Sequence, residues 1–303
     1  MLKAFLAFFV FGVALLSTQD RTIRRLPDTD DSTQVRITTQ LDSLGLLDGY
    51  QIFLNTPICE VEQCYKVQLN LYCDVIGRFV SYDTLTGHEL TKLDHIPFTT
   101  EDYNRLQNIL SNPHSVLERY KKEELVKDRR TSEIEGFTGA TVLEVKRNVI
   151  EGAVYSCHTL WHIAHGQVED SLKRLTASNL NHDLVNKLVS RKNQDINYFL
   201  IDYCSEKQIQ EYLPQLLSTI NDSQGYYAKN ALEKFPKETL NSAQSQQFFV
   251  TNFNQLDYFA QVVLLKKLQK ELLSPSLKNI LIEAKDQRSS LRNELIVKLT
   301  ESP

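Results

Sequence analysis

Residues 135–166 read EGFTGATVLEVKRNVIEGAVYSCHTLWHIAHG, a short turn followed by a longer segment rich in apolar residues. In the longer segment the apolar side chains recur at steps of three and four residues, which is the pattern of one helix face. These residues are Val142, Val145, Val149, Ala153, Val154, Cys157, Leu160, Trp161 and Ala164. We therefore expect one long helix, ended by Gly166 in the left-handed conformation that favours glycine just past a helix end.

The turn before this expected helix contains two glycines and two threonines. A helix start presents free backbone N–H groups and the positive end of the helix dipole, so it favours an anion such as a phosphate. The alternative is a plain helix cap, in which a threonine hydroxyl accepts from the exposed amides and a glycine eases the turn. The residues of the turn leave both interpretations open.

The four residues Thr138, Gly139, Ala140 and Thr141 resemble the Ser/Thr-Gly-Ala-Thr flavinylation motif of FMN-binding domains. Such domains occur in subunits of sodium-pumping NADH:quinone reductases, in Rnf-type electron-transport complexes and in related extracytoplasmic proteins. The resemblance, which covers about residues 50–166, implies that Thr141 carries covalent FMN through a phosphoester bond made by a dedicated flavin transferase. The family usually has an aspartate six residues before the acceptor, and Glu135 occupies that position here.

The composition is that of an ordinary globular protein. The chain has 303 residues, 42% hydrophobic and 24% charged, which is enough for about two domains of roughly 150 residues. A net charge of -4 and the lack of a basic cluster with interleaved aromatics argue against a nucleic-acid partner. Gly-x-Ser-x-Gly, Walker and Gly-x-Gly-x-x-Gly motifs are absent from the sequence. We therefore expect an electron carrier or a binding protein rather than a stand-alone enzyme.

The first residues have the pattern of a targeting segment. Lys3 is followed by the apolar run from Ala4 to Leu16 and then by small polar residues, which predicts a signal peptide over residues 1–19. The alternative is an uncleaved anchor that keeps the protein membrane-associated, although the run is shorter than the ~20 residues of a spanning helix. Either way the location is extracytoplasmic, periplasmic or secreted. Residues 20–40 are polar and are predicted to be a solvated linker.

Residues 41–166 mix strand and helix patterns. Tyr65–Cys73 alternates between apolar and polar residues, which predicts a half-buried strand, and Arg78–Tyr82 is its expected hairpin partner. A helix is predicted from Thr99 or Thr100 to Leu110, and a second one from Ser115 to Val126. Because these elements do not alternate regularly, the sequence predicts an α+β domain.

Residues 167–303 have almost no strand pattern. They predict short amphipathic helices at about 168–177, 181–190, 195–204, 206–220, 224–234, 242–252, 255–270, 275–284 and 289–299. Aromatic pairs recur at spacings of 28 and 32 residues, namely Tyr198-Phe199, Tyr226-Tyr227 and Tyr258-Phe259. This is typical of stacked helix pairs, and so of an all-α helical-repeat (HEAT-like solenoid) domain that binds a partner protein. The alternative is an irregular helical bundle.

The five cysteines fall into two groups. Export permits a disulfide, for which Cys59–Cys64 is the first choice, and a Cys64–Cys73 pair would need the chain to fold back. Cys157 and Cys204 lie on apolar helix faces and are predicted to be small core residues.

Three histidines share one side of the expected long helix: His158, His162 and His165. Imidazoles at such spacing can ligate a metal or haem. We favour the alternative of polar contacts or partly buried rings beside Trp161, because the helix lacks a His-Glu-x-x-His pattern. The sequence therefore predicts no metal site.

Two functions remain. The first is an exported flavin-carrying electron-transfer protein, with FMN on Thr141 and a helical-repeat region that contacts an extracytoplasmic redox or scaffold protein. The second is a non-redox extracytoplasmic protein-interaction scaffold without a cofactor.

Overall fold

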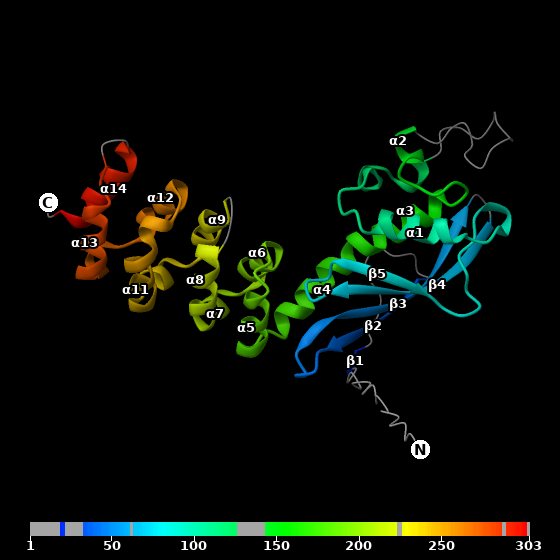
Figure 1. Cartoon of the computed structure of the whole chain (residues 1–303), viewed down its shortest axis with the longest axis horizontal. Helices are drawn as coiled ribbons and strands as arrows, with labels where there is room; N and C mark the ends of the chain where they lie inside the picture. The colour runs from blue at the N-terminus through cyan, green and yellow to red at the C-terminus, as the bar shows by residue number, and fades with distance from the viewer. Residues whose placement is uncertain are drawn as a thin grey trace, which may run out of the picture. The chain divides into compact units, whose positions relative to one another are not determined.

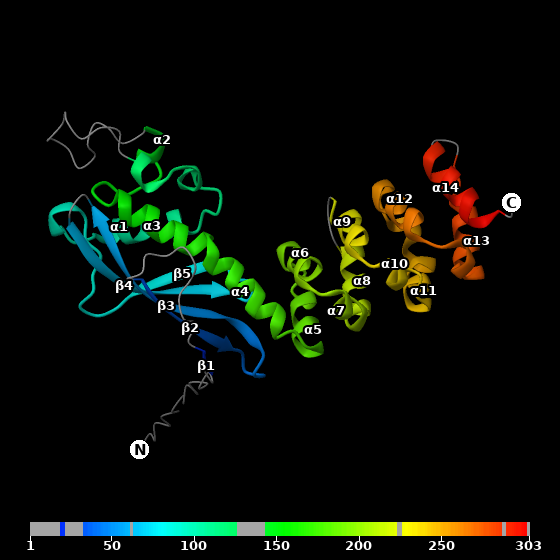
Figure 2. The ribbon, with the colours of Figure 1, turned by 180° about the vertical axis from the view of Figure 1, so that it is seen from behind.

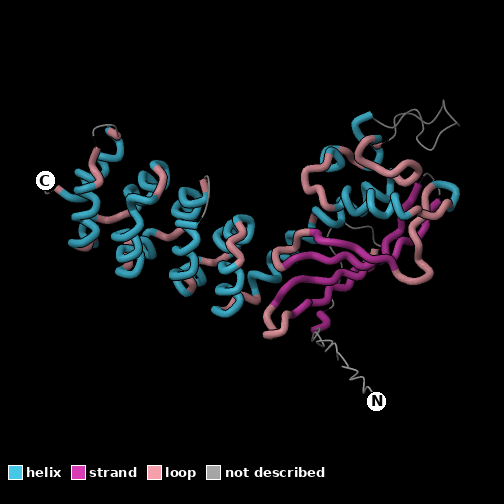
Figure 3. Tube along the Cα trace, in the orientation of Figure 1, coloured by secondary structure: helices cyan, strands magenta, loops and turns pink. Residues whose placement is uncertain are grey.

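The structure, a computed structural model, describes residues 19–21, 33–60, 63–125, 143–222, 226–286 and 289–301. The chain divides into two compact units, Met1–Leu172 and Lys173–Pro303. Every described strand belongs to the first unit, and the described elements of the second are all helices (Figure 3). This is the predicted order of an α+β region followed by a helical one, although the first unit ends at Leu172 rather than at Gly166.

The first unit contains an antiparallel sheet whose strands follow the chain order β1-β2-β3-β4-β5 (Figure 1). The strands are β1 (Gln19–Arg21), β2 (Gln34–Leu41), β3 (Leu47–Glu60), β4 (Gln63–Asp74) and β5 (Phe79–Thr84). The predicted alternation in β4 is confirmed, because Val67, Leu69, Leu71 and Cys73 are all buried. The linker predicted over residues 20–40 is wrong at its end: Val35 and Ile37 are buried, so β2 has its own alternating apolar face.

Helices cover one face of this sheet. The helix α1 (Thr100–Leu110) begins as predicted, and Thr99 and Asp102 form a capping box at its start. Helix α3 (Val154–His165) packs on α1 and on β3, and both helices lie across the same face of the sheet in Figures 1 and 2. The second predicted helix, Ser115–Val126, is wrong: its described residues form two short 3₁₀ turns, η2 (Val116–Arg119) and η3 (Lys122–Glu124).

The single long helix predicted over residues 142–165 is also wrong. The chain forms the four-residue helix α2 (Leu143–Lys146), then a turn, and only then α3. Gly152 has a φ of 73°, which lies in the left-handed region and is incompatible with a continuous helix. Gly166 is not left-handed, with a φ of -101°, and instead joins α3 to α4 (Gln167–Ser178). A Cβ at Gly166 would lie 2.5 Å from the His162 carbonyl oxygen, so this link requires glycine.

The second unit is a succession of short helices close to the predicted spans. They are α5 (His182–Ser190), α6 (Gln194–Tyr203), α7 (Glu206–Glu211), α8 (Leu213–Asp222), α9 (Tyr227–Lys234), α10 (Lys237–Leu240), α11 (Ala243–Asn252), α12 (Tyr258–Lys267), α13 (Pro275–Glu283) and α14 (Ser290–Thr300). The helix predicted at 206–220 divides into α7 and α8, and the four-residue α10 has no predicted counterpart.

These helices pack as successive pairs. The first helices contact one another in the order α5, α8, α11 and α13, and the second helices in the order α6, α9, α12 and α14 (Figure 1). Side-chain hydrogen bonds follow the same step along the chain. Gln208 donates to the Ala177 carbonyl, 31 residues away, and Gln246 donates to that of Leu272, 26 residues away. The pairs therefore contact one another through helix packing, to which the half-buried Gln208 and the buried Gln246 add hydrogen bonds.

The predicted signal peptide, residues 1–19, lies outside the described residues except for Gln19, whose backbone belongs to β1. Within the part of the chain that the structure describes, no helix has the length and apolar character needed to cross a membrane.

Candidate functional site

The predicted flavin acceptor lies in a part of the chain that the structure does not describe. Thr141, with Ala140, Gly139, Thr138 and Glu135, falls between Leu125 and Leu143, where the described residues stop and resume. The long helix expected directly after Thr141 starts only at Val154. The dipole of α3 therefore cannot supply the stabilisation of a phosphate at Thr141 that the sequence pattern predicted.

The segment that follows the motif is held against the first unit. Val145 of α2 is fully buried, and Arg105 of α1 donates to the Arg147 carbonyl at 3.3 Å. Arg105 and Arg147 are exposed and Lys146 is half-buried, so three basic side chains lie on or against α2. The sequence does not reveal this group, because Arg105 and Arg147 are 42 residues apart.

The acidic residue of the same helix is paired with a tyrosine. The Tyr120 hydroxyl donates to the Glu144 carboxylate at 3.3 Å. Desolvation raises the pKa of Tyr120, and the Glu144 carboxylate raises it further. Tyr120 and Glu144 therefore tie η2 to α2. The Arg105, Lys146 and Arg147 side chains and the Glu144 carboxylate therefore lie around α2.

The three histidines of α3 form hydrogen bonds with backbone carbonyl groups. Their Nε2 atoms lie 2.7 Å from the carbonyl oxygen of Tyr120 (for His158), 3.0 Å from that of Leu117 (for His162) and 2.6 Å from that of Leu110 (for His165). Trp161 adds a fourth bond, because its Nε1 donates to the Asn112 carbonyl at 2.8 Å. The predicted polar contacts beside Trp161 are confirmed.

The carbonyl partners of these rings determine which imidazole nitrogen carries the hydrogen. A carbonyl oxygen only accepts, so each histidine Nε2 carries the hydrogen and donates it. A metal bound at these nitrogens would have to replace the three hydrogen bonds that they donate to the carbonyl groups of Leu110, Leu117 and Tyr120. Among the residues that the structure describes, no group of three or more His, Cys, Asp or Glu is arranged around a possible metal position.

His165 supports the end of α1. Leu110 is the last residue of α1, and its carbonyl has no partner within the helix. We expect His165→Leu to lower the free energy of unfolding of the first unit by about 1–3 kcal/mol, since it leaves this buried acceptor unsatisfied. Urea unfolding followed by fluorescence of Trp161, the single tryptophan, measures this change.

The matched control for that variant is His114→Leu, because His114 is exposed on the same segment. We expect this control to unfold within about 0.5 kcal/mol of the wild type. Equal stability of the two variants would show that the His165 bond does not support α1.

The described cysteine side chains are buried and unpaired. Cys157 and Cys204 are core residues as predicted, and Cys73 also faces the core from β4. Burial raises the thiol pKa of Cys73 to about 12, of Cys157 to about 12 and of Cys204 to about 11. A thiolate is the reactive form of cysteine, so these three thiols are unreactive at neutral pH.

The thiols of Cys73 and Cys157 make the stability of the first unit sensitive to alkali. Below pH 9 they are protonated in both the folded and the unfolded chain, so they do not change stability. Above pH 9 only the unfolded thiols ionise, and stability falls until the pH reaches about 12. We expect a loss of up to about 1.4 kcal/mol per pH unit for each thiol. Urea unfolding at pH 8, 10 and 11 tests this, and Cys157→Ala should reduce the slope by one thiol's share.

The backbone positions of the cysteines distinguish between the two predicted disulfides, Cys59–Cys64 and Cys64–Cys73. Cys59 and Cys64 are directly opposite one another in the β3–β4 ladder. Cys64 and Cys73 lie on the same strand, β4, nine residues apart and hence separated by about 30 Å. The Cys64–Cys73 alternative is therefore wrong.

Exposed aromatic residues gather at one edge of the second unit. Tyr226 is 61% exposed, Phe259 51% and Tyr258 40%. The Phe259 ring lies 5.8 Å from that of Tyr226 and 5.6 Å from that of Tyr258, centroid to centroid. We call these three residues the aromatic edge. They come from two of the three predicted aromatic pairs, whereas Tyr227 packs inward against Tyr198 at 5.1 Å.

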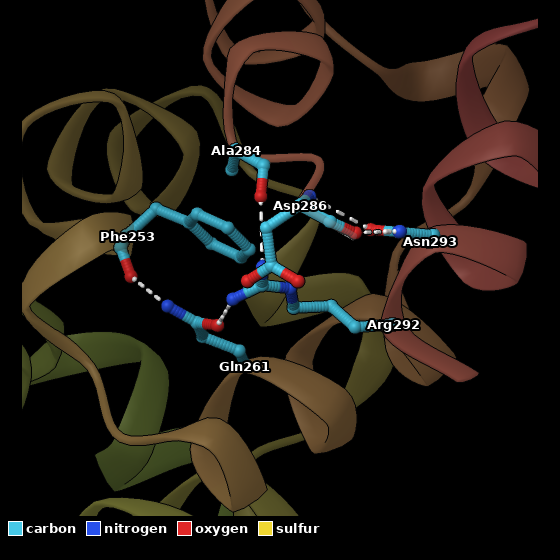
Figure 4. Close-up of polar contacts among 6 residues, drawn as sticks. All are labelled: Phe253, Gln261, Ala284, Asp286, Arg292 and Asn293. Carbon is cyan, nitrogen blue, oxygen red and sulfur yellow. Dashed lines mark hydrogen bonds and ion pairs between the residues drawn. The ribbon is translucent and has the colours of Figure 1, made fainter. Parts of the chain in front are cut away.

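Figure 4 shows the polar contacts around Arg292, a charged residue of the second unit. Its guanidinium donates to the Gln261 side chain at 2.8 Å and to the Ala284 carbonyl at 2.9 Å, and it pairs with Asp286. Gln261 in turn donates to the Phe253 carbonyl at 3.0 Å. Ala284 caps α13, so Arg292 satisfies a carbonyl freed at a helix end. These contacts join α12, α13 and α14 and give Arg292 a structural role.

Comparison with models of known protein families, with curated proteins and with solved structures finds no match to this chain.

Proposed function

We propose that this protein is an exported electron carrier that holds FMN covalently on Thr141. The observation that carries the proposal is the run Thr138, Gly139, Ala140 and Thr141, preceded by Glu135. Small residues before the acceptor let a phosphate approach the backbone closely. The bound flavin would take up and release electrons, while the protein would fix it and tune its potential.

The described residues beside the motif fit a phosphoester. Helix α2 begins at Leu143, two residues after Thr141, and is anchored by the buried Val145. Arg105, Lys146 and Arg147 supply positive charge around α2. Exposed charges of this kind contribute about 1 kcal/mol or less each, which is too little to retain a cofactor. A covalent bond to Thr141 is therefore consistent with these surroundings.

The second unit is assigned a partner-binding role in the same proposal. Its successive helix pairs are interpreted as a HEAT-like repeat array that contacts an extracytoplasmic redox or scaffold protein. A flavin transferase is the other required partner, because the phosphoester needs an enzyme to form it. Both partners place the protein outside the cytoplasm, in the periplasm or as a secreted protein, with membrane association if the first residues are retained.

The test uses the whole protein produced in a host that exports a flavin transferase. We expect fluorescence of flavin that persists in the denatured protein, and a peptide spanning Thr141 whose mass is increased by FMN less one water. A second exported protein with a known flavinylation motif serves as the positive control. Modification of that control without modification of this chain would overturn the covalent proposal.

The aromatic edge favours the second candidate, a scaffold without cofactor. Three clustered rings exposed to water form an apolar surface of the kind that marks protein-interaction sites. Two alleles separate the candidates in the native host, Thr141→Ala and Tyr226→Ala/Phe259→Ala. A carrier loses its function in the first allele. A scaffold keeps its function in the first allele and loses it in the second.

A further inference from the structure

The hairpin of β3 and β4 extends beyond its neighbours in the sheet. The two strands pair from Gly49 opposite Asp74 to Glu60 opposite Gln63. Strand β2 pairs with β3 only as far as Asn55, and β5 pairs with β4 only from Leu69. Residues 56–60 and 63–67 therefore form a ribbon of two strands beyond the described pairing of β2 and β5, with Thr56, Ile58 and Val67 buried on one face.

The register of this ribbon places Cys59 directly opposite Cys64. Pro57, two residues earlier on β3, is opposite Lys66. Proline has no N–H, so Pro57 and Lys66 cannot exchange the two hydrogen bonds of a hydrogen-bonded pair. Hydrogen-bonded and non-hydrogen-bonded pairs alternate along an antiparallel ladder, so Cys59 and Cys64 also form a non-hydrogen-bonded pair.

This type of pair has the spacing that a disulfide needs. Opposite residues in non-hydrogen-bonded pairs have Cα atoms about 4.5 Å apart, closer than in hydrogen-bonded pairs. Disulfides join residues whose Cα atoms are about 4.4–6.8 Å apart. The ladder has no register shift between Gly49 and Glu60, so the parity set by Pro57 holds at the cysteines.

We propose that Cys59 and Cys64 form a disulfide that closes the end of the ribbon. The reaction is thiol–disulfide exchange with a small disulfide such as oxidised glutathione. The two cysteine thiols lose two protons and two electrons, one S–S bond forms between them, and the oxidant is reduced to two thiols. The proposal is independent of the flavin on Thr141, since it concerns a different part of the chain.

The remaining cysteines do not compete for this bond. Cys73, Cys157 and Cys204 are buried and free, and burial raises the pKa of each thiol to about 11 or 12. These three thiols are therefore almost entirely protonated at pH 8, so they attack a disulfide slowly. The odd number of cysteines is explained by one pair and three core residues.

The test is thiol counting on the full chain after incubation with oxidised glutathione at pH 8. Alkylation of the denatured protein should modify three of the five cysteines, and a digest without reductant should yield one peptide pair linked through Cys59 and Cys64. Reduction should speed proteolysis between Glu60 and Gln63 by about tenfold or more, because the ribbon then opens more often.

A double variant, Cys59→Ser/Cys64→Ser, supplies the control, with three alkylated cysteines whether or not oxidant is present and no response of proteolysis to reductant. Five alkylated cysteines in the oxidised wild type would overturn the proposal. A linkage to Cys73, Cys157 or Cys204, or glutathione adducts in place of an internal bond, would overturn it as well.

Discussion

Thr141→Ala yields a protein without covalent flavin, when it is expressed beside an active flavin transferase. The substitution removes Oγ1, the atom that would form the phosphoester bond, so we expect complete loss rather than a partial decrease. The fold should be unaffected, because α3 begins at Val154 and the buried Val145 and Val149 anchor the intervening segment. Flavin fluorescence after denaturation and the mass of the peptide that spans Thr141 measure the result.

Two further variants make this result specific. Thr141→Ser keeps the hydroxyl and should retain the flavin, and Glu135→Asp should match or exceed the flavin content of the wild type, since aspartate is usual at this position of the flavinylation motif that the sequence resembles. Unchanged unfolding of Thr141→Ala, followed through Trp161, rules out misfolding as the cause of the loss. Flavin on Thr141→Ala would show that another residue is the acceptor.

Gln246→Leu should destabilise the second unit by about 3–5 kcal/mol, because three backbone groups lose their only described partner at once. Gln246 is buried in α11, donates to the carbonyls of Asn241 and Leu272, and accepts from the Ser274 amide at 2.7 Å. Leucine keeps the volume but offers neither donor nor acceptor. Urea unfolding followed by circular dichroism measures the loss.

Gln247→Leu is the matched control, because the neighbouring Gln247 is exposed. We expect it to lie within about 0.5 kcal/mol of the wild type. Amide hydrogen exchange locates the damage: Gln246→Leu should speed exchange at Ser274 and at the adjoining start of α13. Equal stability of the two variants would contradict a linking role for Gln246 between helix pairs.

Elements whose signals are local were predictable from the sequence. The alternation over Tyr65–Cys73 lies within β4, and the capping residues Thr99 and Asp102 mark the start of α1. Most helices of the second unit were predicted to within a few residues, because each has its own apolar face and its own start and stop signals. The short α10 lacks the length for such a pattern.

Features that depend on distant parts of the chain were not predictable. The polar residues around Val35 and Ile37 masked β2, whose burial depends on its pairing with β3. Gly152 was the local signal for the break before α3, but the apolar periodicity continues through it. The histidine partners come from segments 38 to 55 residues earlier in the chain, and no spacing within α3 reveals them.

The packing of successive helix pairs affects how the length of the second unit can change during evolution. Within the second unit, each helix pair packs on the next pair, and the hydrogen bonds between neighbouring pairs join residues 26 to 31 positions apart. Loss of the pair α13 and α14 removes one interface between pairs, whereas loss of an internal pair removes two. During evolution the second unit can therefore lose a whole pair most readily at α13 and α14, whereas β3, which pairs on both sides, cannot be lost from the sheet in the same way.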